Sequence, residues 1–313
     1  MIGALRNRGV LAALAAALLF GVATPAAKLL LGETPPWLLA GLLYLGSGLG
    51  LFLWRRVRRL QAVAVSRDER LWLAGAVACG GIVAPVLLLY GLLAMPASGA
   101  SLLLNAEGVF TALIAWFAFK ENFDRRIALG MVAIVAGAVV LAWPGDAQFG
   151  SAWPALAVLG ACLAWGLDNN LTRRVSHLDA TYVAMVKGLA AGATNTALAV
   201  VAGATWPGAQ AVAASLTLGF FSYGLSLALF VVALRHLGTA RTGAYFSTAP
   251  FAGAALAIVF LGESPGWQFA VAAGLMAIGV WLHLSERHEH PHTHGTLTHS
   301  HPHYPDADHR HRH

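Results

Sequence analysis

A single carboxylate lies in the middle of an apolar stretch of helical length. Residues 101–121 read SLLLNAEGVFTALIAWFAFKE, with Asn105 and Glu107 at the centre. A charged side chain at the centre of a membrane helix costs about 2.5–3.5 kcal/mol on insertion scales, so such residues are functional-site candidates by default. We expect Glu107 to bind a proton or a cationic group in a central cavity. The alternative is a protonated Glu107 that hydrogen-bonds a neighbouring helix and serves only structure.

Two opposite charges stand in two later, consecutive apolar stretches. Asp168 begins the D-N-N cluster that continues with Asn169, and Lys187 lies in the following stretch. Paired buried charges neutralise each other, so we expect Asp168 and Lys187 to approach. The pair would serve either as a structural contact or as a gate in which Lys187 binds an anionic group of a cargo. Asn105 lies roughly 200° around the helix from Glu107 and would contribute a second polar face.

Hydroxyl groups mark a later apolar stretch. Tyr245 and Ser247 precede Pro250 there, and we expect them to line the cavity opposite Glu107 or to pack as ordinary small-residue faces. Proline removes a backbone donor and interrupts a helix. Pro250 and Thr24-Pro25 are therefore expected to break their helices, which is tolerated where the backbone faces a cavity.

Ten of the thirteen histidines fall in residues 286–313, a segment too polar and too rich in breakers to fold alone. Imidazoles at His-x-His spacing suit Zn, Ni or Co ions. The tail is expected either to capture metal or to be a disordered segment with adventitious metal affinity. The candidate ligands are His288, His290, His292, His294, His299, His301 and His303.

The composition indicates a polytopic membrane protein. Of 313 residues, 58% are hydrophobic and 11% charged, and the mean hydropathy is +0.66, whereas soluble chains are about 25% charged. The two cysteines, Cys79 and Cys162, indicate neither a disulfide framework nor a thiolate metal site. The cations lie in short loops, which argues against nucleic-acid binding. The sequence contains no catalytic constellation, so we do not expect an enzyme.

Membrane-spanning helices need about 17–25 apolar residues. The sequence predicts an all-α polytopic fold with ten of them, at residues 9–31, 36–54, 70–93, 97–118, 126–144, 152–172, 179–203, 211–234, 239–261 and 266–284.

Charge predicts their orientation. The segments at alternate helix ends carry 18 of the 20 Lys and Arg residues. Because cytoplasmic loops are enriched in cations, both termini are expected in the cytoplasm, with the chain in the cell inner (plasma) membrane.

The chain matches itself weakly when it is shifted by about 142 residues, which brings Phe119-Lys120-Glu121 onto Leu261-Gly262-Glu263. We expect two five-helix repeats, residues 1–146 and 147–285, followed by a disordered cytoplasmic tail, residues 286–313. An odd number of helices inserts the two halves in opposite orientations. In such inverted repeats the substrate site lies near the bilayer midplane.

Two glycine pairs allow close helix packing, Gly46 with Gly50 and Gly188 with Gly192. We expect them to serve packing within one chain. A homodimer is the alternative to a monomer in the lipid bilayer.

The order of these features resembles the drug/metabolite transporter superfamily, EamA type. The resemblance rests on the acidic ends of the fourth and ninth helices, Glu121 and Glu263, and on the aromatic-glycine pairs Phe20-Gly21 and Trp165-Gly166. It implies a secondary transporter that exports small organic metabolites or amino acids by proton coupling or exchange. One alternative is a divalent metal exporter supplied with ions by the tail, and another is a membrane metal sensor.

Overall fold

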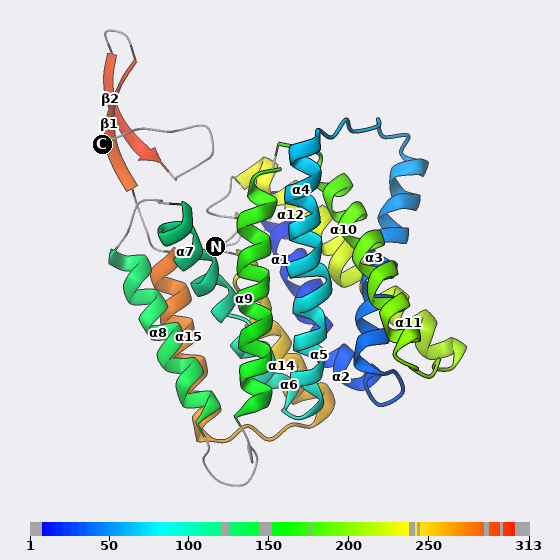
Figure 1. The fold of residues 1–313 in the computed structure, drawn as a ribbon. Coiled ribbons are helices and arrows are strands. Elements are labelled where there is room, and N and C mark those ends of the chain that lie inside the picture. Colours follow the sequence, from blue (N-terminus) through cyan, green and yellow to red (C-terminus); the bar gives the residue numbers. More distant parts are fainter. Residues whose placement is uncertain are drawn as a thin grey trace.

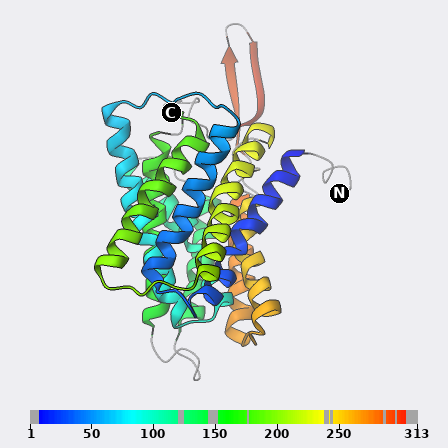
Figure 2. The same ribbon diagram turned by 90° about the vertical axis from the view of Figure 1, so that its right-hand side faces the viewer.

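The structure is a computed structural model. It describes residues 8–119, 125–143, 152–175, 177–237, 242 and 245–284, and the backbone of residues 288–294 and 297–303. The described part of the chain up to Leu284 is a bundle of helices that run side by side (Figures 1 and 2). The expected all-α architecture is confirmed.

The helices cover ten successive stretches of the described chain, several of them divided. Their bounds in chain order are α1 (Arg8–Gly21), α2 (Ala23–Leu30), α3 (Pro36–Val57), α4 (Arg67–Ala76), η2 (Val77–Val83), α5 (Ala84–Leu93), α6 (Ala97–Leu103), α7 (Ala106–Phe119), α8 (Arg125–Ala142), α9 (Trp153–Arg173), α10 (Ala180–Val201), α11 (Ala209–Gly219), η3 (Phe220–Leu225), α12 (Ser226–Leu237), α14 (Ala249–Leu261) and α15 (Trp267–Leu284).

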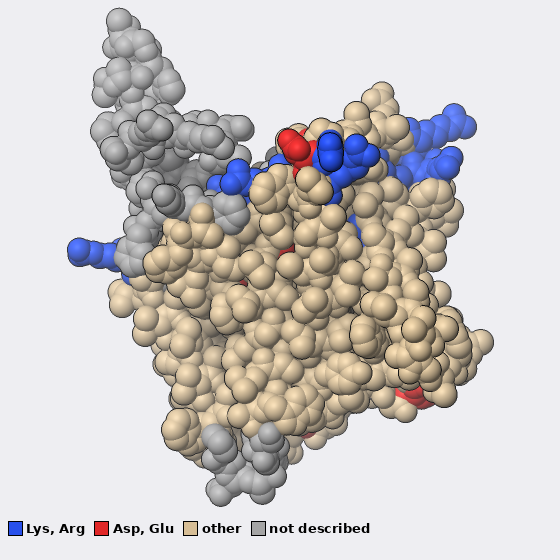
Figure 3. Space-filling model, viewed as in Figure 1, with Lys and Arg blue, Asp and Glu red and all other residues tan. Residues whose placement is uncertain are grey.

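Six helical segments of the described chain are long and apolar enough to cross a membrane. They are Arg8–Leu30, Pro36–Val57, Arg67–Leu93, Ala97–Ala118, Ala180–Val201 and Ala209–Ala233. The broad side of the molecule carries few charged atoms, and the Lys and Arg side chains gather along one end (Figure 3). We call this the basic end, because the arginine-rich connection from α3 to α4 lies there (Figure 1).

Two interruptions match the proline positions. The chain breaks at Val22 between α1 and α2, so that Pro25 lies at the start of a new helix. Ser247 and Thr248 form a turn before α14, and Pro250 occupies its first turn. At a first turn the missing N–H of proline has no helical partner to lose.

The predicted segment 97–118 is confirmed in its bounds, but it is not one continuous helix. α6 ends at Leu103 and α7 begins at Ala106, with Leu104 and Asn105 in a turn. Hydropathy does not reveal this break, because the residues on both sides of it are apolar.

Glycine lets α3 lie very close to its neighbours. A methyl group added at Gly188 of α10 would lie 2.6 Å from the backbone nitrogen of Gly48, and one added at Gly46 would overlap the backbone of Leu216 in α11. Both glycine pairs therefore pack inside the chain, as their spacing indicated.

A buried arginine joins α3 to α10 at the basic end. Arg55 Nη1 donates to Asp179 Oδ1 at 2.6 Å and to Thr181 Oγ1 at 2.6 Å. Asp179 also caps α10 by accepting from the Tyr182 N–H. Although partial burial opposes ionisation, the hydrogen bonds from Thr181 and Tyr182, together with Arg55, hold the pKa of Asp179 below its usual value.

The histidine-rich segment forms two antiparallel strands, β1 (His288–His294) and β2 (Leu297–His303). Their register pairs His288 with His303, His290 with His301, and His292 with His299. The hairpin projects beyond the basic end of the bundle (Figure 2). The composition predicted a disordered tail, whereas the strands pair through backbone hydrogen bonds, which do not depend on apolar side chains.

The close approach of α3 and α10 gives a stability prediction. Gly188→Ala should destabilise the protein by about 1–3 kcal/mol, because the added methyl meets backbone atoms that cannot move aside. Thermal unfolding of the purified protein in detergent measures the effect. Gly274→Ala in α15 is the matched control, since a methyl there meets nothing within 4 Å. Equal melting temperatures for the two variants would contradict the packing argument.

Candidate functional site

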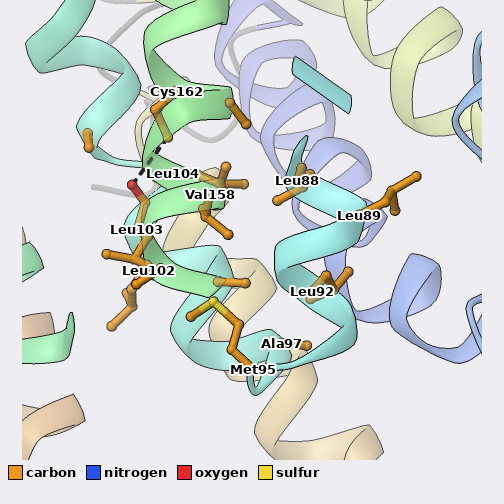
Figure 4. Close-up of a cluster of buried hydrophobic side chains, with 14 of the residues drawn as sticks. Leu88, Leu89, Leu92, Met95, Ala97, Leu102, Leu103, Leu104, Val158 and Cys162 are labelled. Atoms are coloured by element: carbon orange, nitrogen blue, oxygen red, sulfur yellow. Dashed lines mark hydrogen bonds between the residues drawn. The ribbon is translucent and has the colours of Figure 1, made fainter. Parts of the chain in front are cut away.

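The break between α6 and α7 places Glu107 in the first turn of a helix. The positive end of the helix dipole favours an anionic side chain there. The carbonyl groups that the break frees have partners inside the protein. The Asn105 side chain donates to the Leu102 carbonyl at 2.9 Å, and the Cys162 thiol donates to the Leu103 carbonyl at 3.5 Å (Figure 4). Asn105 is thus buried as a support of the break.

Glu107 lies within a polar network between α7 and α9. Asn169 Nδ2 donates to Glu107 Oε1 at 2.9 Å and to Thr111 Oγ1 at 3.1 Å. The Thr111 hydroxyl donates in turn to the Glu107 backbone carbonyl at 2.8 Å. The structure therefore unites Glu107 with Asn169, and it adds Thr111 as a bridging hydroxyl.

Asn170, the residue after Asn169, holds α7 and α9 together. Asn170 Nδ2 donates to the backbone carbonyls of Thr111, at 3.1 Å, and Gly166, at 2.9 Å. Gly166 permits the approach, because a methyl there would lie 2.9 Å from Phe110 Cβ. Asn170 therefore sets the α7–α9 contact from which Asn169 reaches Glu107.

Asp168 and Lys187 form the expected ion pair. Lys187 Nζ lies 2.6 Å from each carboxylate oxygen of Asp168, and the Thr172 hydroxyl donates to Oδ1 at 2.8 Å. The Lys187 side chain is 17% exposed and that of Asp168 is 7% exposed. Burial makes such a pair dependent on both partners, since either charge alone would be costly to desolvate.

A π-helical segment beside this pair escaped the sequence analysis. Within η2 the Gly80 carbonyl accepts from Tyr44 Oη at 2.7 Å and from Trp165 Nε1 at 3.0 Å. A methyl at Gly80 would overlap the Asp168 carboxylate. Such π segments recur at functional sites because they break the regular backbone ladder. The Gly80-Gly81 pair is the signal that could have indicated it.

Aromatic rings continue from this point across the bundle. Tyr44 stacks on Tyr223 of η3 at 5.5 Å, and Tyr223 contacts Phe20 edge-on at 5.9 Å. Phe20 in turn lies 5.4 Å from Phe246. The residues come from four different helical segments, so their meeting cannot be read from local spacing.

Residues next to Glu107 are exposed. Asn169 and Gly108 are exposed, and a methyl added at Gly108 would meet nothing within 4 Å. Glu107 forms no ion pair within the described part of the chain. The arrangement can therefore present an acceptor carboxylate, an amide and a hydroxyl to a small solute or a proton.

For Tyr245, one of the two hydroxyl residues expected either opposite Glu107 or in ordinary packing, the structure shows packing. Tyr245 packs against a cluster of Ala12, Ala13 and Ala233, between α1 and α12. Ser247 lies in the turn before α14. Within the described residues, neither hydroxyl appears in the hydrogen bonds of Glu107. The tail histidines assigned as metal ligands have side chains outside the described part, and no group of three metal-ligating side chains occurs within it.

A family model described as the EamA-like transporter family matches residues 7–143 and again residues 152–285. An uncharacterized transporter from Methanothermobacter thermautotrophicus is 28% identical over 294 residues, covering 88% of this chain and 85% of the other. Purine permease 2 from Arabidopsis thaliana is 43% identical over 59 residues, which is 19% of this chain and 16% of that protein.

A solved crystal structure supports the same fold. Its chain is 20% identical, with a TM-score of 0.66, and the match covers 88% of this chain and 96% of that one. The double match of the family model over almost the whole helical bundle is decisive: the chain belongs to the EamA-like transporter family of the drug/metabolite transporter superfamily and is a membrane transporter.

Proposed function

We propose that this transporter exports small organic metabolites or amino acids by proton coupling or exchange, with Glu107 as the coupling or binding carboxylate. The observation that carries the proposal is the broken helix at Glu107, where the exposed Asn169 amide donates to the carboxylate. Broken helices with polar groups at the break are typical of transporter sites. The short match to a protein named a purine permease agrees with an organic cargo.

Orientation follows from charge. The basic end carries the arginine-rich connection between α3 and α4, and cytoplasmic loops are enriched in cations. We place this end, and both termini, in the cytoplasm, with the protein in the cell inner (plasma) membrane.

Asp168 and Lys187 act in this proposal as a neutralised pair that positions Asn169. The contact of Lys187 with both carboxylate oxygens, and the Thr172 hydroxyl on Oδ1, support a structural pair over a cargo contact. Asn169 directly follows Asp168, so a displaced carboxylate would move the amide that reaches Glu107.

Two close helix contacts at glycine residues agree with an inverted repeat. Gly21 lies against the Gly253 backbone and Gly166 against that of Thr111. The shift of about 142 residues brings Thr111 onto Gly253, and η2 and η3 also stand at about this separation. Residues 1–146 and 147–285 are therefore proposed as the two repeats, with the site between them.

Glu107→Gln tests the central assignment. We expect uptake of a ¹⁴C-labelled mixture of amino acids and nucleobases into inverted vesicles to fall at least about tenfold and to lose its pH dependence, because glutamine cannot exchange a proton. Glu33→Gln, which changes an exposed carboxylate away from the site, is the control. Normal uptake and normal pH dependence in Glu107→Gln would refute the assignment.

A double variant tests the ion pair. Lys187→Ala should lose uptake, because it leaves the Asp168 carboxylate buried without its partner, at a cost of about 3–5 kcal/mol. Lys187→Ala combined with Asp168→Ala should regain much of it. A double variant as inactive as the single one would instead assign Lys187 to the cargo.

A second candidate concerns the tail. We propose that it captures Zn²⁺, Ni²⁺ or Co²⁺, since the strand register sets three histidine pairs opposite each other at alternate positions. This function would serve a divalent metal exporter or a membrane metal sensor. It ranks second, because the family match supports a transporter but identifies no ion.

Equilibrium dialysis with ⁶³Ni²⁺ or ⁶⁵Zn²⁺ tests metal capture. The full chain should bind metal, and a variant with asparagine at the seven candidate histidines should lose most of it, because asparagine offers no imidazole. Uptake of the same ions into inverted vesicles then separates capture from export. Equal binding by both proteins would exclude the tail site, and loss of ion uptake in the variant would favour the exporter.

A further inference from the structure

The turn between α5 and α6 is held from two sides by charged residues of other helices. Lys28 of α2 donates to the backbone carbonyls of Leu92 at 2.5 Å, Leu93 at 3.3 Å and Met95 at 3.1 Å. Glu263, which follows α14, accepts from the backbone N–H groups of Ala97 at 2.7 Å and Ser98 at 2.8 Å. One cation and one anion thus bind successive parts of the same turn.

Both contacts cap a helix end with the charge that suits it. The last carbonyls of α5 and the first N–H groups of α6 have no partner within their own helices. A cation at a helix C-terminus and an anion at a helix N-terminus are each favourable. Pro96, at the N-cap of α6, makes no side-chain cap bond, so the carboxylate of Glu263 supplies it from outside.

The partners come from segments far apart in the sequence. Lys28 lies in α2 and Glu263 follows α14, whereas the turn that they hold joins α5 to α6. Directly below, α14 packs against α6, and a methyl at Gly253 would lie 2.9 Å from Ser101 Oγ and 2.8 Å from the Gly21 carbonyl. Leu92, Met95 and Leu102 complete a tightly buried cluster there (Figure 4).

The end of the bundle that contains the α5–α6 turn lies opposite the basic end. It is more deeply buried than the region around Glu107. Ser101 is 1% exposed, whereas Gly108 and Asn169, farther along towards the basic end, are exposed. A cavity of about 370 Å³ borders Glu263 on the outer side and is lined by Pro96, Trp267 and Phe269 among others. Between that cavity and Glu107, α6 packs against α14, with Ser101 buried at the contact.

We propose that Lys28 and Glu263 form an outer latch, which keeps the extracellular end shut while the site is open on another side. Release of the latch uncaps α5 and α6, and it lets α2 and α14 separate from the turn at Ala94–Pro96. The latch rests on the chain being a transporter and on the orientation proposed above. It does not depend on the role of Glu107.

Labelling of a cysteine at position 101 tests the latch without any cargo. Ser101 lies between the latch and the site and is buried, so a Ser101→Cys thiol reacts with an external, membrane-impermeant maleimide only when the outer end opens. The background is Cys79→Ala with Cys162→Ser, where serine keeps a donor for the Leu103 carbonyl. Intact cells expose the outer end only, if the orientation is right.

Removal of either charge should speed labelling. We expect Lys28→Met and Glu263→Gln each to raise the rate about tenfold, because each removes a charge from a helix end. Lys28→Arg, which keeps the cation, should label slowly. Glu33→Gln, an exposed carboxylate on the connection after α2, is the matched control and should leave the rate unchanged.

The outcomes separate the latch from other causes. Unchanged rates in both Lys28→Met and Glu263→Gln would overturn the proposal, and so would equally fast labelling in Lys28→Arg. A parallel set of variants retains Cys162 as its single cysteine, and because Cys162 is buried in the same cluster its labelling reports unfolding. Fast labelling of Cys162 in Glu263→Gln would show that Glu263 stabilises the fold and does not act as a latch. Labelling only from inverted vesicles would overturn the orientation while leaving the Glu107 test intact.

Discussion

Backbone hydrogen bonds that break inside a bilayer must be replaced inside the protein, because hydrocarbon offers neither donors nor acceptors. The α6–α7 interruption obeys this constraint through the Asn105 amide and the Cys162 thiol. The π segment η2 obeys it through Tyr44, Trp165 and Asn195, whose side chains bond the carbonyls of Gly80 and Gly81. The irregular backbone near Glu107 therefore depends on polar side chains contributed by other helices.

The same constraint governs the charges. Asp168 with Lys187 is buried as a matched pair, and Lys28 with Glu263 is matched to helix ends. Glu107 differs, since its carboxylate has an exposed amide partner, Asn169, and no ion-pair partner among the described residues. A carboxylate in that position can exchange its amide partner for another donor.

Much of the architecture could be predicted, because membrane helices carry their signal locally in length and polarity. The interruptions at Thr24-Pro25 and Pro250 and the approach of Asp168 to Lys187 were also within reach, since proline chemistry and charge burial act at known positions. The break at Leu104 and Asn105, the π segment at Gly80 and the packing of Tyr245 against Ala12 were not. They depend on which helices become neighbours, and apolar sequences do not encode that in any local pattern.

The sequence by itself determined that this is a polytopic helical membrane protein with a carboxylate, Glu107, near the middle of its fourth apolar segment. Hydrocarbon does not solvate polar groups, so the length of the apolar segments and the positions of the charges largely fix which segments span the membrane. Only the tertiary structure decided that Glu107 opens a new helix beside Asn169, and that Lys28 and Glu263 meet at one turn. Those contacts join residues from distant segments, and their partners are fixed by three-dimensional packing rather than by spacing along the chain.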